Sequence, residues 1–443
     1  MGSYSFLRIG DINLRLVSEE DDFNPTVLVL FDETDKRVRE FSGEDDQIPE
    51  DWDDPPEFIV DYAISLTVAK DRLEFMGFTM SKVSHIFQEG REERIADLAQ
   101  RRTDSRWTTK DHMKTYLDQE EKIWKELTFE TWLKGFTYII ANKLEIDKRY
   151  DWLRDESSSD ERLPRNIRYM LGRTLGGLFS FPSYDHRAFL RAAIEVIGTD
   201  GELVYDLTEL ISKYFSADAD FCADARWQMS DDLAIQKIVV LTEGKSDKWV
   251  LEGALQLLYP HLASYYSFMD FDSARVAGSA SELVKMVKAF IGAGISNRII
   301  ALFDNDTAAQ SAMRALKEIK IPKHVRVLRY PDIQLAKSYP TLGPRGTVVM
   351  DVNGLAGSLE LYFGLDVLTG EDSSLTPIQW RGYDEALHQY QGEVLNKGKL
   401  QEKFKSKLRD CHADRSLIDK FDWDGIQAII KSLRTTFHDT DAA

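Results

Sequence analysis

Three acidic residues follow two apolar stretches at positions suited to phosphodiester chemistry. Glu243 ends the stretch IVVLTEG, and Asp304 and Asp306 end the stretch RIIALFDND. If both stretches are strands of one parallel sheet, their carboxyl ends lie at the same edge, where functional groups of such sheets gather. Carboxylate oxygens at this modest density suit Mg²⁺, which binds through few protein ligands together with substrate phosphate. The pattern therefore predicts a divalent-metal site.

A metal site of this kind has a clear use. Phosphodiesters resist attack because they are negatively charged, and two cations clamp both the attacking and the leaving oxygen. Bound cations reverse the sign of an acidic cluster, so such a cluster can serve an anionic substrate. We therefore expect one or two Mg²⁺ or Mn²⁺ ions and a nucleic acid substrate, either DNA or RNA.

The elements that would position these acids alternate regularly. Strands are predicted over 238–244, 265–271, 298–306 and 324–331, and helices over 247–259, 281–291 and 307–319. This alternation predicts a parallel sheet covered by helices. Gly244 allows a sharp turn after the first strand, and Ser246 is expected to cap the helix that follows.

The segments VVLTEGKSD and IIALFDNDTA resemble the Toprim domain, which is shared by type IA and II topoisomerases, bacterial primases, a ribosomal-RNA maturase and the OLD nucleases. The resemblance covers residues 236–350 and implies a Rossmann-like α/β fold. It implies that Glu243, Asp304 and Asp306 bind the metal, with Glu243 also catalytic. Asp247 matches a further metal ligand of the nuclease branch, which favours cutting over strand passage.

The nuclease branch also supplies a further carboxylate and a lysine. Glu360, in SLELYFG, is the expected carboxylate, and Asp351 is its alternative. Lys399, in NKGKLQEKF, is the expected catalytic lysine, which would neutralise charge developing at the phosphate, and Lys397 is its alternative.

Other branches of the family fit this sequence poorly. A topoisomerase needs a catalytic tyrosine on a further large domain, for which there is little room, and a primase needs a zinc module. The two cysteines, Cys222 and Cys411, form no C-x-x-C pair and are typical of a reducing cytoplasm. The sequence contains no G-x-x-x-x-G-K-[ST], so any ATPase activity would come from a partner.

We expect an α+β, mostly helical N-terminal domain over residues 1–230. Its strands lie within 1–35, as SYSFLRI, INLRLV and TVLVLF, and helices dominate from about Ile59, including DYAISLTVAKDRLEFMGF. Exposed connections are expected over 41–58 and 154–166. A mainly helical extension over 351–443 is expected to complete the site.

SYSFLRIGDINLRL and DRLEFMGFTMSKV resemble the N-terminal module that accompanies HEPN or Toprim effectors in bacterial conflict systems. This resemblance implies defence against phages or plasmids. An HEPN ribonuclease would require Arg, four to six residues, then His, and the pairs Arg106–His112 and Arg381–His388 satisfy that spacing. Such pairs arise readily by chance, so an HEPN active site is the weaker hypothesis.

Charge is distributed unevenly along the chain. The net charge is −19, yet residues 236–443 contain 26 Lys and Arg against 26 Asp and Glu, so the whole acidic excess lies in residues 1–235. We expect the acidic half to face a protein partner or to aid solubility, and the balanced half to face nucleic acid. No stretch approaches 18 apolar residues, so a cytoplasmic protein without membrane spans is expected.

Two alternatives to a nuclease stay open at the level of sequence. The C-terminal half could be a non-catalytic regulatory or interaction module of a defence complex. It could also be a phosphohydrolase of small nucleotides, because bound metals do not specify substrate size.

Overall fold

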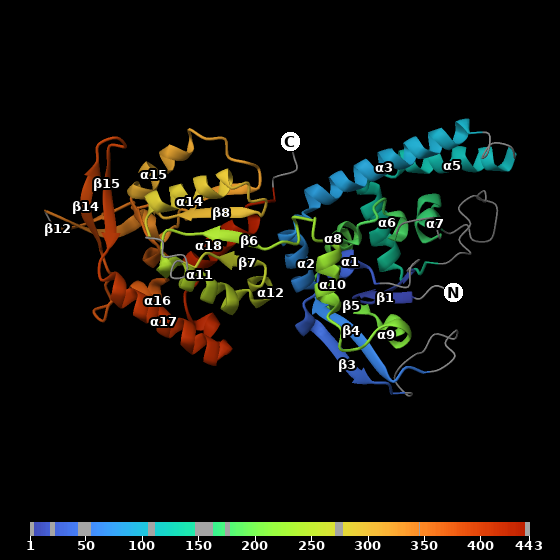
Figure 1. The fold of residues 1–443 in the computed structure, drawn as a ribbon, viewed down its shortest axis with the longest axis horizontal. Helices are drawn as coiled ribbons and strands as arrows, with labels where there is room; N and C mark the ends of the chain where they lie inside the picture. Colours follow the sequence, from blue (N-terminus) through green and yellow to red (C-terminus); the bar gives the residue numbers. More distant parts are fainter. Residues whose placement is uncertain are drawn as a thin grey trace. The chain divides into compact units, whose positions relative to one another are not determined.

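The computed structural model describes residues 4–17, 23–42, 55–104, 111–146, 163–172, 178–270, 278–344 and 346–438. Contacts divide the chain into two compact units, residues 1–230 (unit 1) and residues 231–440 (unit 2). Each unit mixes helices and strands (Figure 1). Within the described residues, no helix combines the length and the apolar character needed to cross a bilayer.

Unit 1 is built on an antiparallel sheet of five strands in the order β2-β1-β5-β4-β3. The strands are β1 (Tyr4–Ile9), β2 (Ile12–Val17), β3 (Lys36–Glu40), β4 (Phe58–Ser65) and β5 (Glu202–Asp206). The central strand, β5, is the last in sequence and pairs with both β1 and β4. The sheet is therefore complete only when β5, near the C-terminal end of this unit, pairs with β1 at its N-terminal end.

The helices of unit 1 pack around an aromatic core. They are α1 (Pro25–Leu28), α2 (Leu66–Phe75), α3 (Met80–Thr103), α5 (Asp111–Glu126), α6 (Phe129–Ala141), α7 (Arg165–Leu171), α8 (His186–Ile197), α9 (Thr208–Tyr214) and α10 (Phe221–Gln228). Trp132 is fully buried, stacks on Phe136 at 5.0 Å and meets Phe181 edge-on at 5.1 Å. Trp124 is also buried, so both tryptophans serve packing, as expected; Trp107 lies outside the described residues.

Two sequence predictions in unit 1 are wrong. TVLVLF is not a strand, because α1 begins at Pro25 and the Asn24 side chain accepts hydrogen bonds from the backbone of Thr26 and Val27. An N-cap followed by proline is a strong helix start, and it overrides the strand preference of valine and leucine. DYAIS, assigned to a helix, belongs to β4, whose pairing with β5 continues to Ser65, the N-cap of α2.

Unit 2 contains a parallel sheet of four strands in the order β10-β8-β6-β7. They are β6 (Ile238–Leu241), β7 (Tyr266–Phe268), β8 (Ile299–Phe303) and β10 (Val325–Arg329). All three pairings are parallel, as the strand–helix alternation predicted. Every residue of β8 is buried, which explains its uninterrupted run of apolar residues.

Helices cover both faces of this sheet. On one face, α14 (Ala280–Gly292) and α15 (Thr307–Met313) pack Leu283, Val287 and Ala309 against Ile299, Ala301 and Phe303. On the other face lies α11 (Lys245–Leu258), which also packs against α17 (Lys397–Ala413) and α18 (Asp424–Thr435). Figure 1 shows α14 and α11 on opposite sides of β6, β7 and β8.

The segment after residue 350 is less helical than predicted. Beside α17 and α18 it contains the short α16 (Leu365–Leu368) and a hairpin of β14 (Ile378–Asp384) and β15 (Gln389–Val394). This hairpin joins β11 (Tyr339–Gly343) and β12 (Gly346–Met350) in a second sheet, ordered β12-β11-β14-β15. The strands were missed because the hairpin reads IQWRGYDEALHQYQGEV, a largely polar stretch without strict alternation.

A two-residue strand, β13 (Ala356–Gly357), pairs with β9 (Asn305–Asp306) directly after the parallel sheet. A Cβ atom at Gly357 would lie only 2.6 Å from the backbone oxygen of Asn305, so the two strands approach this closely only because residue 357 is glycine.

We expect Gly357→Ala to reduce the free energy of unfolding by about 1–3 kcal/mol, because the added methyl group must push β13 away from β9. Urea denaturation of the full chain measures this change. Gly382→Ala, in β14, is the matched control, since a Cβ there meets nothing within 4 Å. Equal stability of both variants would contradict the close approach.

Candidate metal centre

The parallel sheet has a topological switch point between β6 and β8. From β6 the chain crosses to β7 on one side, and it later returns to place β8 on the other side. Ligands of such sheets bind at the carboxyl ends of the strands flanking a switch point. Glu243 follows β6 and Asp304 follows β8, so the fold places both acids at that edge.

Glu243 and Asp304 lie side by side. The backbone N–H of Asp304 donates to Oε1 of Glu243 at 2.9 Å. Burial raises the pKa of Glu243 to about 7, and the carboxylates of Asp306 and Asp247 add to the rise, while the Asp304 N–H opposes it. Burial and then Glu243 raise the pKa of Asp304 well above its usual value. The Oδ1 atom of Asp304 is buried and has no hydrogen-bond partner.

Asp247 joins this pair from the first turn of α11. Its side chain is almost fully buried, and burial followed by the charge of Glu360 raises its pKa to about 7. The Gly244 N–H and the Tyr330 hydroxyl donate to it and oppose the rise. The expected Ser246 cap is not formed, because the helix begins at Lys245 with Gly244 as N-cap.

Asp306 performs a structural task at the same edge. Its Oδ1 accepts from the backbone N–H of Ala309 at 2.8 Å and so caps α15. Its Oδ2 accepts from Nε2 of Gln391 at 2.7 Å. Its charge nevertheless acts on both Glu243 and Asp304, so Asp306 belongs to the same electrostatic cluster.

Glu360 reaches the cluster through the pairing of β13 with β9. It is buried, its Oε2 accepts from the Ser358 hydroxyl at 2.8 Å, and its Oε1 accepts from Nε2 of Gln401 at 2.8 Å. Its charge raises the pKa of Asp247, so Glu360 faces the other acids. Asp351, the alternative, is exposed and accepts from Asn353 instead.

Of the two candidate lysines, the structure brings Lys397 to the acids. Its Nζ lies 3.7 Å from Oε2 of Glu360. Burial lowers its pKa, but Glu360, Asp304 and other carboxylates outweigh burial, so the net pKa is raised. Lys399, the preferred candidate from sequence, is exposed on α17. The difference arises because the two lysines lie two residues apart on α17 and therefore point to nearly opposite sides of the helix, which begins directly after the left-handed Asn396 (φ 54°).

Three residues that hydrogen-bond to the clustered acids were not predicted from the sequence. Tyr330 follows β10 at the same edge and donates to Asp247, so its position at a strand end was a usable signal. Gln391 and Gln401 hold Asp306 and Glu360, but they lie in a hairpin and a helix whose approach to the edge has no sequence signature.

The donor set fits a divalent cation. Among the described residues, no three His, Cys, Asp or Glu side chains converge in the geometry of a formed metal site. Several carboxylates are instead held by neutral N–H or O–H donors, so ligation by all of them requires side-chain rotation. An unpartnered oxygen on Asp304 and several like charges crowded at low exposure are what a divalent cation would neutralise.

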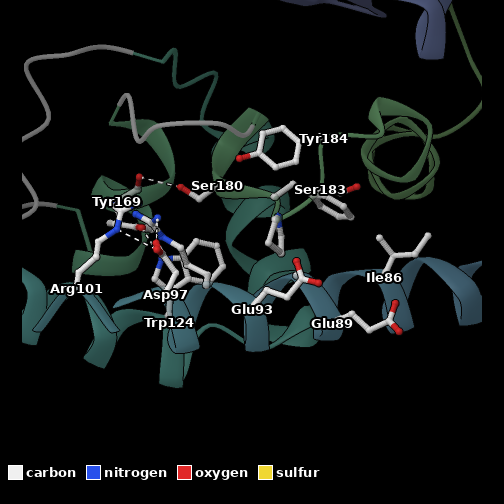
Figure 2. A pocket seen from close by; sticks show the side chains of 14 residues that line it. Ile86, Glu89, Glu93, Asp97, Arg101, Trp124, Tyr169, Ser180, Ser183 and Tyr184 are labelled. Atoms are coloured by element: carbon white, nitrogen blue, oxygen red, sulfur yellow. Dashed lines mark hydrogen bonds and ion pairs between the residues drawn. The ribbon is translucent and has the colours of Figure 1, made fainter. Parts of the chain in front are cut away.

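A cavity of about 530 Å³ lies elsewhere, in unit 1 (Figure 2). Arg94 bridges Asp97 at 3.1 Å and the buried Glu120 at 2.7 Å, and the Tyr169 hydroxyl donates to Glu120 at 3.0 Å. These contacts pair Arg94 with both acids, and the carboxylate cluster of unit 2 is not part of this cavity.

Neither Arg–His pair gains support as an HEPN site. Arg106 and the side chain of His112 lie outside the described residues. Arg381 forms an ion pair with Glu393 at 2.5 Å within the β14–β15 hairpin, and His388 lies in its turn.

Residues 1–228 match a family model described as HEPN/Toprim N-terminal domain 1. Comparisons with curated proteins and with solved structures give no match. The match covers unit 1 and ends before β6, so the carboxylate cluster lies outside it.

The crowding of carboxylates predicts that Asp304→Asn stabilises the metal-free protein by about 1 kcal/mol at pH 8, because burial and the neighbouring carboxylates disfavour the ionised form of Asp304 in the folded state and the amide has no charge to bury. The gain should shrink toward pH 6. Glu243 and Asp247 have raised pKa values of about 7, so they bind protons in the folded state before the unfolded chain does, which relieves the repulsion in the wild type. Urea denaturation in EDTA at both pH values, with the exposed Asp419→Asn as control, measures this effect.

Proposed function

Because the chain belongs to the HEPN/Toprim N-terminal domain 1 family, we propose that unit 2 is a divalent-metal-dependent nuclease acting in defence against phages or plasmids. It hydrolyses phosphodiester bonds of DNA or RNA and uses Mg²⁺ or Mn²⁺. The observation that carries this proposal is the gathering of Glu243, Asp304 and Asp306 with Asp247 and Glu360 at one switch point of a parallel sheet. The family membership by itself hints only at a nuclease-related defence system.

The carboxylates would hold the cation. Glu243 and Asp304 follow adjacent strands, and the backbone N–H of Asp304 holds the carboxylate of Glu243 in place. Asp247 is held in the first turn of α11, and Glu360 is held by two neutral donors. When bound, a divalent cation supplies positive charge at the phosphodiester and lowers the pKa of water.

Lys397 would act on the phosphate itself. Its ammonium is kept protonated by the surrounding carboxylates, and its side chain is partly exposed, so it is both charged and reachable from solvent. A fixed positive charge at this place stabilises the additional negative charge that develops on the phosphoryl oxygens during cleavage. Tyr330, whose pKa is raised well above its usual value by burial and by Asp247, stays neutral and orients Asp247.

A nuclease of this kind predicts metal-dependent cleavage that Glu243→Ala abolishes, because the variant removes a ligand and the partner of the Asp304 N–H. Wild type and variant are compared on supercoiled DNA, linear DNA, single strands and tRNA with Mn²⁺. Glu252→Ala, a partly exposed glutamate on the same helix as Asp247, is the matched control. Equal cleavage by wild type and Glu243→Ala would refute the site.

Metal binding is checked without activity. Mn²⁺ should raise the melting temperature of the wild type, since a ligand of the folded state stabilises it, and should raise that of Glu243→Ala much less.

The positions of Lys397 and Lys399 predict different losses of cleavage rate when each is replaced by alanine. Lys397→Ala should reduce the cleavage rate roughly 10²- to 10³-fold, because it removes a charge aimed at the phosphate in a site of low exposure. Lys399→Ala should have a much smaller effect, and Lys405→Ala, on the same helix, serves as control. Single-turnover rates at saturating Mn²⁺ give these values; a larger loss for Lys399→Ala than for Lys397→Ala would reverse the assignment.

A further inference from the structure

The outermost strand of the second sheet of unit 2 is exposed on both faces. All five residues of β12 are exposed, and Val348 and Val349, which project to opposite faces, are 52% and 60% exposed. In the part of the chain that the structure describes, β12 pairs with β11 alone, so its other side is an open edge. Such an edge is a template for a further strand, because its N–H and C=O groups are free to bond.

Other edge strands of this chain carry charges, which are a usual protection of sheet edges against further pairing. β3, at the edge of the unit 1 sheet, reads KRVRE, and β10, at the edge of the parallel sheet, reads VRVLR. β12 reads GTVVM, with no charge, no proline and a continuous register with β11. Its open edge is therefore suited to a partner strand.

The pairing with β11 decides which backbone groups of β12 face the open edge. The backbone oxygen of Val348 accepts from the Thr341 hydroxyl of β11 at 2.9 Å, so Val348 directs its backbone groups inward. In an antiparallel ladder this direction alternates from one residue to the next, so Thr347 and Val349 direct theirs outward. Pro340, opposite Val349, agrees with this alternation, because proline has no N–H to donate.

A second copy of the same strand fits this open edge. In antiparallel pairing about a two-fold axis at Val348, Thr347 of each copy opposes Val349 of the other. Both residues direct their backbone groups outward, so each of the two pairs can exchange two hydrogen bonds. A shift of the register by two residues would move a partner outside β12, so pairing about Val348 uses the strand most fully.

The side chains and charges agree with this register. Val348 lies against Val348 of the second copy and Thr347 against Val349, and β-branched cross-strand pairs stabilise a sheet. Arg345, which lies outside the described residues, and Asp351 are each three positions from Val348 in the sequence, so the register sets opposite charges against each other. An uncharged contact also suits two copies that each carry a net charge of −19.

We propose that two copies of this chain associate through β12, by antiparallel pairing about a two-fold axis at Val348. The second sheets of the two copies then form one continuous sheet. A two-fold contact closes on itself, so it produces a dimer and not a fibre. The contact between two five-residue strands is small, so the dimer is reversible and its population rises with protein concentration. This inference does not depend on the proposed nuclease function.

Cysteine cross-linking tests the position of the axis. Val348→Cys places two thiols opposite each other in a non-hydrogen-bonded pair, where Cα atoms lie about 4.5 Å apart, within the range of a disulfide. The natural Cys222 and Cys411 are buried. Oxidation of the full-length variant with copper phenanthroline should give a covalent dimer on a non-reducing gel. Val38→Cys, at a similarly exposed valine on the charged edge strand β3, is the matched control and should stay monomeric.

Sedimentation equilibrium measures the association itself. The wild type should form a dimer that dissociates on dilution. Val348→Lys brings two like charges together at the axis and should raise the dissociation constant about tenfold or more, whereas Val38→Lys should leave it unchanged. Circular dichroism checks that both lysine variants are folded.

Three results overturn the proposal. The wild type could be monomeric at every concentration, in which case the open edge serves a strand of another protein. The dimer could be unaffected by Val348→Lys, which would place the contact elsewhere on the chain. Cross-linking of Val348→Cys could be no faster than that of Val38→Cys, which would exclude the two-fold axis at Val348.

Discussion

The crowding of like charges at the carboxyl edge of the parallel sheet is the constraint on which unit 2 depends. Isolated acids at a protein surface repel each other weakly, because water screens them. Here Asp247, Asp306 and Glu360 are almost fully buried, and the charge of each acts on another member of the cluster. Burying like charges together lowers the free energy of unfolding. A divalent cation that neutralised them would offset this cost.

The surrounding elements hold the acids from several directions. The strands β6 and β8 place Glu243 and Asp304 side by side, α11 begins with Asp247, and the β13–β9 pairing brings Glu360. The hairpin β14–β15 adds Gln391 and, through the turn into α17, Lys397. Residues from about 238 to 401 thus meet at one edge, so the segment after residue 350 contributes to the candidate site.

Unit 1 has a different organisation. Its antiparallel sheet is complete only when β5 pairs with both β1 and β4. The region that matches the family model therefore folds as one unit. Some of its buried charges are paired internally, as in the network of Arg94, Glu120 and Tyr169. The acidic excess of the chain resides in this unit, whereas residues 236–443, which hold the carboxylate cluster, are balanced in charge.

The sequence by itself determined the parallel sheet and the placement of Glu243, Asp304 and Asp306, because long apolar strands followed by acids depend on local periodicity and on a general rule of sheet edges. It could not determine which lysine faces the acids, since Lys397 and Lys399 point to nearly opposite sides of α17 and only the packing of that helix decides which side meets the acids. It also misread TVLVLF and the β14–β15 hairpin, where an N-cap and cross-strand pairing override residue preference. Only the tertiary structure decided these points, because they depend on contacts between residues far apart in the chain.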